Sequence, residues 1–228
     1  MNELPIKFNK TLNPKLWENH NLKPEVSKAL LKIANEFVNF LKVDVTPVDI
    51  VLLGSNTNYN YTEYSDIDVH IILNYEEVGN DFDLVKEYFN SKKYIWNMEH
   101  DILIKGYEVE LYVQDVDEEN ASTSIYSLLN RKWIKTPKMD KQSIDKHEVM
   151  TKSSDFIQRI EMSKGDLESL NDLKDKIKKM RKSGLSKSGE YSIENLVFKT
   201  LRNGGYIKKL MGYAKEIYDK KLSLKELN

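Results

Sequence analysis

The sequence predicts an α+β fold in its first part and an all-helical fold in the rest. Up to about residue 113, helix-spaced apolar residues alternate with short apolar runs of strand length. Beyond about residue 140, only helical spacing recurs. We therefore expect a mixed sheet with flanking helices in residues 1–139 and a helical C-terminal domain in residues 140–228.

The first part is expected to hold two helices, two strands and a hairpin. Pro24 suits the first turn of a helix that ends near Lys42. A strand at 48–53 is expected because a short apolar run ends at Gly54, and a tight turn with a short helix follows at 55–62. The further expectations are a strand at 66–73, a helix at 82–97 with Leu84 in its apolar stripe, a hairpin at 101–113, and an irregular or strand segment at 121–139.

The second part shows three helical patterns. The first contains Leu167, Leu170, Leu173, Ile177 and Met180 and is expected to end at Ser183-Gly184, with 183–189 as a short flexible link at most. The second is closed by Asn203-Gly204-Gly205, and the last spans about 207–217. No fixed-period repeat is present.

The bulk composition is that of a globular protein with an uneven charge distribution. The 228 residues are 40% hydrophobic and 31% charged, with a net charge of −1. Residues 1–130 hold 11 Lys/Arg and 22 Asp/Glu, whereas residues 131–228 hold 24 and 14. An acidic part suits metal ions and a basic part suits phosphates or nucleic acid, although two differently charged solvated surfaces would look the same.

Several functional classes are excluded or disfavoured. The sequence has no Cys, so disulfides and thiolate metal sites are excluded, and its four His lack the spacing of a zinc site. The N-terminus has no apolar core of the signal-peptide kind, and no run approaches the length of a membrane span. We expect a cytoplasmic protein without membrane contact.

The most informative motif is Gly54-Ser55, ten residues, then Asp66-Ile67-Asp68-Val69. A Gly-Ser turn after a buried strand offers backbone N–H groups and a hydroxyl to a phosphate. Asp66 and Asp68 share one face of the next strand, as does His70. Two carboxylates this close need a cation between them, and Mg²⁺ with a polyphosphate is the obvious candidate.

A third acid is expected on a neighbouring strand. Glu110 lies in Val109-Glu110-Leu111, where an unpaired carboxylate among apolar residues would be costly. Glu108 shares its strand face and remains the alternative. Glu110 is preferred because it is more central in the apolar run.

These residues together resemble the signature of the DNA polymerase β superfamily of nucleotidyltransferases. The resemblance covers residues 25–115, and the run 54–72 is similar to small predicted nucleotidyltransferases of phages and bacteria. It implies a polymerase β-like sheet domain, with host cytoplasm as the location if the protein is phage-encoded.

The resemblance also implies site roles and a reaction. Gly54 and Ser55 would bind the triphosphate of an NTP such as ATP. Asp66 and Asp68 would hold the Mg²⁺ that bridges the phosphates, and Glu110 would join them at a second metal; Mn²⁺ is possible. An acceptor hydroxyl would attack the α-phosphate and pyrophosphate would leave.

The acceptor is open: an RNA 3′ end, slightly favoured by the basic second part, a protein hydroxyl or a small molecule. Lys179 and Lys199 are candidate phosphate ligands across a cleft between the two domains, although a solvated basic face explains Lys179 equally well. The competing functions are a non-catalytic nucleotide- or RNA-binding module on the same fold and, more distantly, an Asp-x-Asp glycosyltransferase.

Overall fold

The computed structural model describes residues 7–120, 122–139 and 144–224. The chain divides into two compact units, one formed by Lys7–Asp140 and one that contains Lys141–Asn228. We call them the sheet unit and the helical unit.

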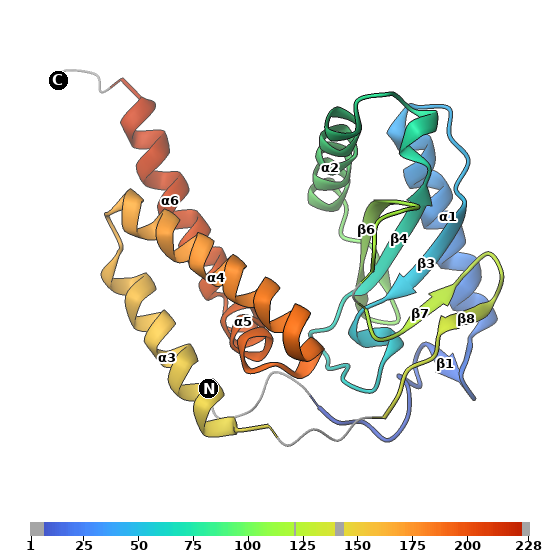
Figure 1. Ribbon diagram of the computed structural model, residues 1–228, viewed down its shortest axis with the longest axis horizontal. Coiled ribbons are helices and arrows are strands. Elements are labelled where there is room, and N and C mark those ends of the chain that lie inside the picture. The colour runs from blue at the N-terminus through green and yellow to red at the C-terminus, as the bar shows by residue number, and fades with distance from the viewer. Residues whose placement is uncertain (1–6, 121, 140–143, 225–228) are drawn as a thin grey trace. The chain divides into compact units, whose positions relative to one another are not determined.

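The sheet unit is built on a six-stranded mixed sheet with the strand order β5-β6-β4-β3-β7-β8 (Figure 1). Strands β4 and β6 are parallel, and the other neighbouring pairs are antiparallel. A two-stranded sheet of β1 and β2 precedes it. The strands are β1 Trp17–Glu18, β2 Asn21–Leu22, β3 Asp49–Leu53, β4 Ile67–Leu73, β5 Leu103–Ile104, β6 Tyr107–Asp115, β7 Ile125–Ser127 and β8 Lys132–Lys135.

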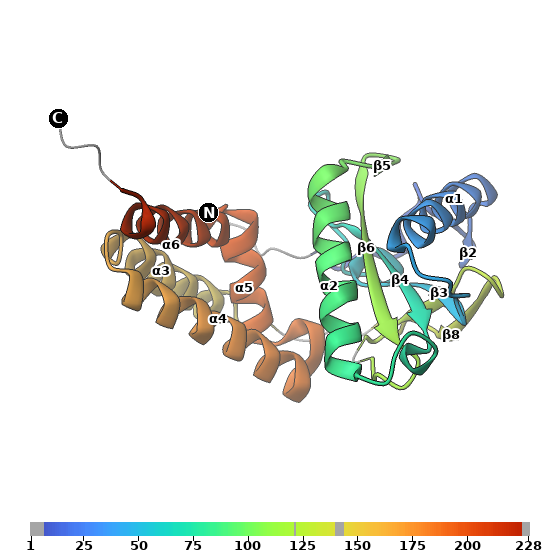
Figure 2. The same ribbon diagram turned by 90° about the horizontal axis from the view of Figure 1, so that it is seen from above.

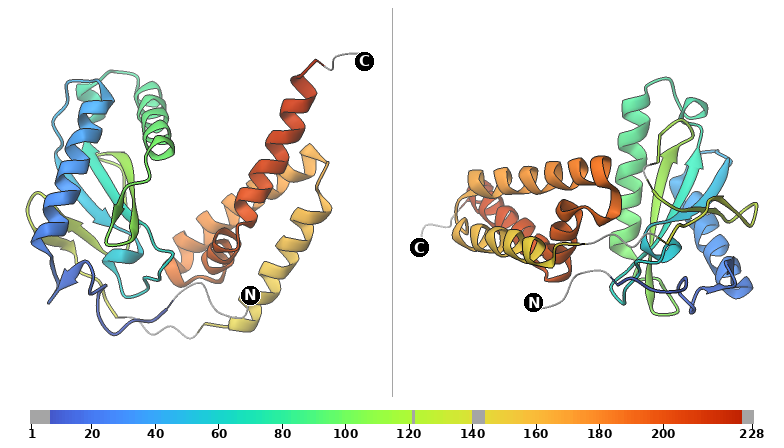
Figure 3. Two further views of the ribbon diagram at one scale, coloured as in Figure 1. Left: turned by 180° about the vertical axis from the view of Figure 1, so that it is seen from behind. Right: turned by 60° about the horizontal axis from the view of Figure 1, so that its bottom comes forward.

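Two helices cover one face of this sheet. Seen from behind, α1 (Pro24–Leu41) lies over the strands (Figure 3), and α2 (Phe82–Glu99) runs alongside β6 (Figure 2). Alternate residues of β4, such as Val69 and Ile71, are fully buried on this inner face, whereas Asp68 and His70 point to the other, outer face. The alternation in β4 therefore separates a hydrophobic core from a polar surface.

The mixed sheet with flanking helices confirms the predicted α+β class. The expected helices and strands are present, and 121–139 supplies β7 and β8. The prediction for Leu84 is wrong, since its side chain is 68% exposed and Val85, Phe89 and Trp96 form the buried stripe of α2. The hairpin of β1 and β2 was not predicted, because strands of two residues have no readable period.

The helical unit has its own hydrophobic core. Leu170, Leu173 and Ile177 of α4 pack with Leu196 and Leu201 of α5. The helices of this unit are α3 Lys146–Met162, α4 Leu167–Ser188, α5 Ile193–Asn203 and α6 Tyr206–Leu222. The described residues also form short 3₁₀ helices: η1 Ser55–Thr57 and η2 Tyr75–Glu77 in the sheet unit, and η3 Gly189–Tyr191 in the helical unit.

Two expectations for the helical unit need correction. Helix α4 does not stop at Ser183-Gly184 but continues to Ser188, so most of 183–189 is helix rather than a flexible link. Gly184 is buried there, and a β-carbon on it would lie 2.6 Å from Glu194 Cβ and 2.7 Å from Ser192 Oγ. Close packing against the start of α5 explains a glycine inside a helix.

Helix α3 was not singled out by its sequence. Its buried positions are Val149, Ser153, Phe156 and Ile160. The hydroxyl of Ser153 donates to the carbonyl of Val149 at 2.7 Å, so a serine occupies a core position without an unpaired polar group. That serine interrupts the apolar period that would otherwise predict the helix.

Among the residues that the structure describes, no helix is long and apolar enough to cross a membrane.

Candidate active site

The turn after β3 brings the chain directly against a carboxylate. Gly54 has φ 79° and ψ −164°, a conformation that is essentially confined to glycine. A β-carbon on Gly54 would lie 2.0 Å from Oδ2 of Asp68. Glycine is therefore required here both for backbone conformation and for space, and Asp68 lies beside the Gly54-Ser55 turn.

Side-chain hydrogen bonds hold this turn against the start of β4. The hydroxyl of Ser55 donates to Oγ of Ser65 at 2.8 Å, and Nδ2 of Asn56 donates to the carbonyl of Asp66 at 2.9 Å. Asn13 and Trp17 hold Asn56 from the N-terminal segment, through bonds of 2.8 Å and 2.7 Å. The expected short helix is the single turn η1. A turn this short has no helix dipole of note, so it offers a phosphate only its leading backbone N–H groups.

The parallel pairing of β4 with β6 sets the acids in two rows on the outer face. Asp68 pairs with Glu110, and on its other side with Leu53 of β3. The first pair of the ladder is Ile67 with Val109, so Asp66 lies beside Glu108 one step earlier. Asp66, Asp68 and Glu110 are half-buried, whereas Glu108 is exposed.

The side chains of these acids do not converge on one point. The hydroxyl of Tyr112 donates to Oε2 of Glu110. Within the described ranges, no three Asp, Glu or His side chains are arranged to hold a metal ion together. The backbone thus brings Asp68 and Glu110 into register, while the Glu110 carboxylate is held by Tyr112.

The donor set nevertheless fits a hard divalent cation. All candidate ligands are carboxylate oxygens, which Mg²⁺ and Mn²⁺ prefer. The acids also repel one another: partial burial, then the negative charges of Asp66, Glu110 and Asp101, raise the pKa of Glu108. Asp66, Asp68 and Glu110 are the residues that would hold such a cation, with Glu108 at the exposed end.

Tyr112 is a residue of the site that the sequence reasoning missed. Burial, then the charges of Asp68, Glu110 and Asp66, raises its pKa, so the hydroxyl stays protonated and remains a donor to Glu110. The signal was present in the strand alternation, because Tyr112 is two residues after Glu110 and shares its face. Ser65 and Asn56 were missed because their roles depend on turn contacts that have no sequence period.

His70, on the strand face of Asp68, is a hydrogen-bonded histidine. Its Nδ1 lies 2.9 Å from Oε1 of Gln114, and its ring stacks on Tyr112 with centroids 4.8 Å apart. Burial lowers the pKa of His70 to about 4, so the imidazole is neutral at physiological pH.

The two lysines predicted to bind phosphate belong to the helical unit. Lys179 is on α4, in a shallow cavity whose lining also includes Asp172, Asp175 and Lys176. Lys199 is on α5. The carboxylates belong to the sheet unit, which contains neither lysine, and the role of Lys179 and Lys199 stays a prediction.

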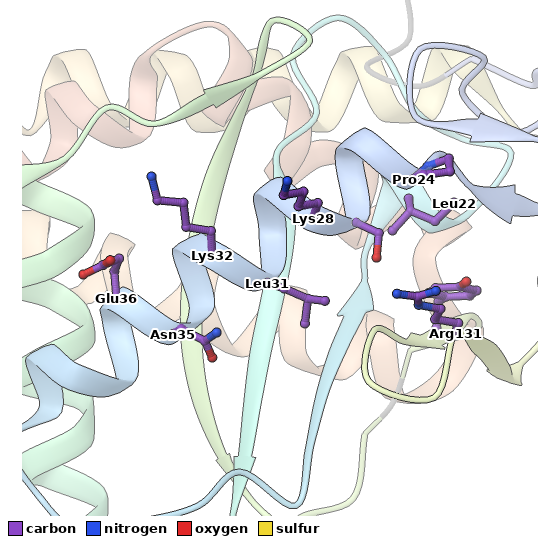
Figure 4. A pocket seen from close by; sticks show the side chains of 10 residues that line it. Leu22, Pro24, Lys28, Leu31, Lys32, Asn35, Glu36 and Arg131 are labelled. Carbon is purple, nitrogen blue, oxygen red and sulfur yellow. The ribbon is translucent and has the colours of Figure 1, made fainter.

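Another cavity, of about 660 Å³, lies away from the acids. It is lined by α1 and by Tyr126, which pairs with Leu52 and packs in the hydrophobic core on the inner face of the sheet. In Figure 4 the side chains of Lys28 and Lys32 point away from Arg131, so these cations do not converge on one ligand. The cavity is therefore separate from the candidate active site, which is on the outer face.

The comparison with protein families identifies the domain that carries these residues. Residues 31–134, from within α1 to β8, match the model of the family described as "Nucleotidyltransferase domain". This part of the chain is a nucleotidyltransferase domain, and its fold and motif fit the DNA polymerase β superfamily. No curated protein and no solved structure matched the chain.

Proposed function

We propose that the protein is a metal-dependent enzyme that transfers a nucleoside monophosphate from an NTP to an acceptor hydroxyl. The observation that carries the proposal is the contact of the Gly54 turn with Asp68, whose other neighbour in the sheet is Glu110. This contact supports the proposal because the Gly54-Ser55 turn and two acids lie side by side within the segment that matches a nucleotidyltransferase domain.

Each residue has a distinct task. The backbone of Gly54 and Ser55 binds the triphosphate, and the hydroxyl of Ser55 rotates from Ser65 to donate to a phosphate oxygen. Asp66, Asp68 and Glu110 hold Mg²⁺, or Mn²⁺, which when bound neutralises the phosphates and acidifies the attacking hydroxyl. Tyr112 orients Glu110 through its hydrogen bond.

The transfer is an in-line displacement. The acceptor oxygen forms a bond to the α-phosphorus, and the bond from that phosphorus to the oxygen bridging to the β-phosphate breaks. Pyrophosphate leaves with the electron pair, and the hydroxyl proton is released to solvent. ATP is the first donor to test, and an RNA 3′ end is the favoured acceptor because residues 131–228 carry an excess of 10 positive charges.

To test the proposal, pyrophosphate release is measured with each NTP in the presence of Mg²⁺ and an RNA, protein or small-molecule acceptor. Asp66→Asn and Asp68→Asn should each lower the rate by on the order of 10²-fold or more, because the site then holds less well the cation whose charge stabilises the transition state. Asp83→Asn is the matched control, since Asp83 belongs to the exposed pair Asp81 and Asp83 at the start of α2. Full activity in both site variants would refute the assignment.

One observation favours a second function, a nucleotide- or RNA-binding module without catalysis. The acids of the described residues do not form a preassembled three-ligand group. Under this alternative, labelled NTP binds with Mg²⁺ but no NTP and acceptor combination yields pyrophosphate. Release of pyrophosphate that depends on Asp68 would exclude it.

A further inference from the structure

A polar cavity of about 280 Å³ adjoins the acids on the outer face of the sheet. His70, Tyr112 and Gln114 form its floor. Lys86, Asn90 and Lys93, which are spaced along one face of α2, form one wall, and the loop 118–120 borders it as well. Tyr112 joins cavity and acids, because its ring lines the cavity while its hydroxyl donates to Glu110.

The cavity and the Gly54-Ser55 turn lie on opposite sides of Asp68 along β4. Along the outer face of β4, Asp68 contacts the Gly54 turn and His70 lies one two-residue step further on, about 7 Å away. An in-line displacement sets the attacking oxygen opposite the leaving group. If pyrophosphate leaves toward Gly54 and Ser55, the acceptor hydroxyl approaches from the side of His70 and Tyr112.

The floor of the cavity is rigidly hydrogen-bonded. Oε1 of the buried Gln114 lies 2.9 Å from Nδ1 of His70 and accepts from Nδ2 of Asn120 at 3.2 Å, while its Nε2 donates to the carbonyl of Glu118 at 2.8 Å. This arrangement assigns the proton of His70 to Nδ1 and leaves Nε2 as an acceptor. A fixed acceptor in the lining of the cavity suits a ligand with hydroxyl groups.

The two lysines of the wall differ in their charge partners. Lys86 forms an ion pair with Glu118 at 3.2 Å, which neutralises it. Lys93 is half-buried over the ring of Tyr112, 5.1 Å from its centroid, and has no ion pair with a carboxylate in the described part of the chain. Because Lys93 contacts Tyr112, it marks the end of the cavity that is nearer to Glu110, where it can bind an anion.

We propose that this cavity binds the acceptor, and that the acceptor is a ribose phosphate unit whose hydroxyl faces Glu110 and whose phosphate contacts Lys93. This inference rests on the proposed function of the same site. The volume is near the lower limit of ligand pockets, about 300 Å³, and suits one sugar-phosphate unit. The same chemistry is offered by a free sugar phosphate and by the terminal nucleotide of an RNA.

Binding without catalysis tests the proposal. Amide chemical shifts of the ¹⁵N-labelled protein are followed during separate titrations with ribose 5-phosphate, ribose, inorganic phosphate and a short RNA with a 3′ hydroxyl. We expect ribose 5-phosphate or the RNA to shift residues 86–93 and 112–120, with at least tenfold weaker binding of ribose or phosphate alone. RNA binding without ribose 5-phosphate binding identifies RNA as the source, and the reverse identifies a free sugar phosphate. No shift at these residues with either overturns the proposal.

Lys93→Gln should weaken this binding by about tenfold, the loss of one charge-assisted contact. Lys92→Gln is the matched control, because Lys92 is adjacent on α2 but lies over Phe40, at 4.9 Å. Equal affinities of the two variants would overturn the role of Lys93, and thermal unfolding checks that both are folded.

Turnover separates this inference from the proposed function. Where transfer occurs, Lys93→Gln should raise the KM for the acceptor and leave the KM for NTP unchanged; an effect on the NTP alone overturns the acceptor assignment. Binding of ribose 5-phosphate or RNA at the cavity without any transfer would refute the enzyme and keep the cavity. Transfer with an unchanged KM for the acceptor in Lys93→Gln would keep the enzyme and refute the binding of the acceptor in this cavity.

Discussion

Gly54 and Asp68 are in such close contact that any side chain at position 54 would collide with the Asp68 carboxylate, 2.0 Å from a β-carbon. The contact joins the end of β3 to the second residue of β4. The turn and the acid therefore form one local structure, and a substitution at either residue should displace the other.

Gly54→Ala should therefore destabilise the sheet unit by about 3 kcal/mol or more, from strain in the backbone together with the collision. Gly106→Ala is the matched control. Gly106 also has positive φ, 87°, but among the described residues the nearest atom to its β-carbon, beyond its chain neighbours, is the flexible Lys15 Nζ at 3.9 Å, so a loss of only about 1 kcal/mol is expected. Urea unfolding measures both. Equal losses would mean that the contact with Asp68 is relieved at no cost.

Tyr112→Phe should lower kcat about tenfold, because Glu110 loses the donor that orients it. The Mg²⁺ concentration for half-maximal activity should rise as well, since a reoriented Glu110 binds the cation less well. Tyr88→Phe is the control, as its hydroxyl donates to the carbonyl of Leu41, between α2 and the end of α1. An unchanged kcat and unchanged Mg²⁺ dependence in Tyr112→Phe would contradict a positioning role.

His70 should make stability fall in acid. Its pKa is lowered from 6.5 to about 4 by burial, so between these values the unfolded chain binds more protons than the folded one. The contribution is complete above about pH 6.5 and is lost as the pH falls, by about 2 kcal/mol between pH 7.5 and pH 5. Urea unfolding at both pH values should show this extra loss in the wild type but not in His70→Gln. Parallel losses would place the imidazole in contact with water.

Two glycines in helices should respond in opposite directions to alanine. Gly212 of α6 has nothing within 4 Å of a β-carbon, so Gly212→Ala should stabilise the helical unit by about 1 kcal/mol through helix propensity. At Gly184 the same gain is outweighed by collision with Ser192 and Glu194, and Gly184→Ala should be destabilising. Thermal unfolding distinguishes them, and a gain at both positions would show that α4 and α5 can move apart.

Much of the sheet unit was predictable because its signals are local. The alternation in β4 separates Val69 and Ile71 from Asp68 and His70 with no reference to other strands. The Gly-Ser turn, its distance from the acids and the apolar strand before it are all read along the chain. The family match agrees with that reading for residues 31–134.

The helical unit was less predictable where local signals mislead. Ser183-Gly184 is a sequence typical of a helix end, but α4 continues through it. Gly184 has no side chain and so leaves room for Ser192 and Glu194. Ser153 breaks the apolar period of α3, yet it is buried because its hydroxyl bonds within the helix. The first exception is decided by packing between two helices, and the second by a hydrogen bond within α3 that the apolar period does not reveal.

The sequence by itself determined the strand face of Asp66, Asp68 and His70, the turn before them and the presence of acids on a later strand, because the two-residue period of a strand is a property of its own backbone. Only the tertiary structure decided that Glu110 pairs with Asp68 while the exposed Glu108 lies beside Asp66, since the register of β6 against β4 depends on which apolar residues reach the core. The bond from Tyr112 to Glu110 joins two residues of one strand, whereas the cavity between β6 and α2 follows from the same register and from the packing of the helix, which no single segment encodes.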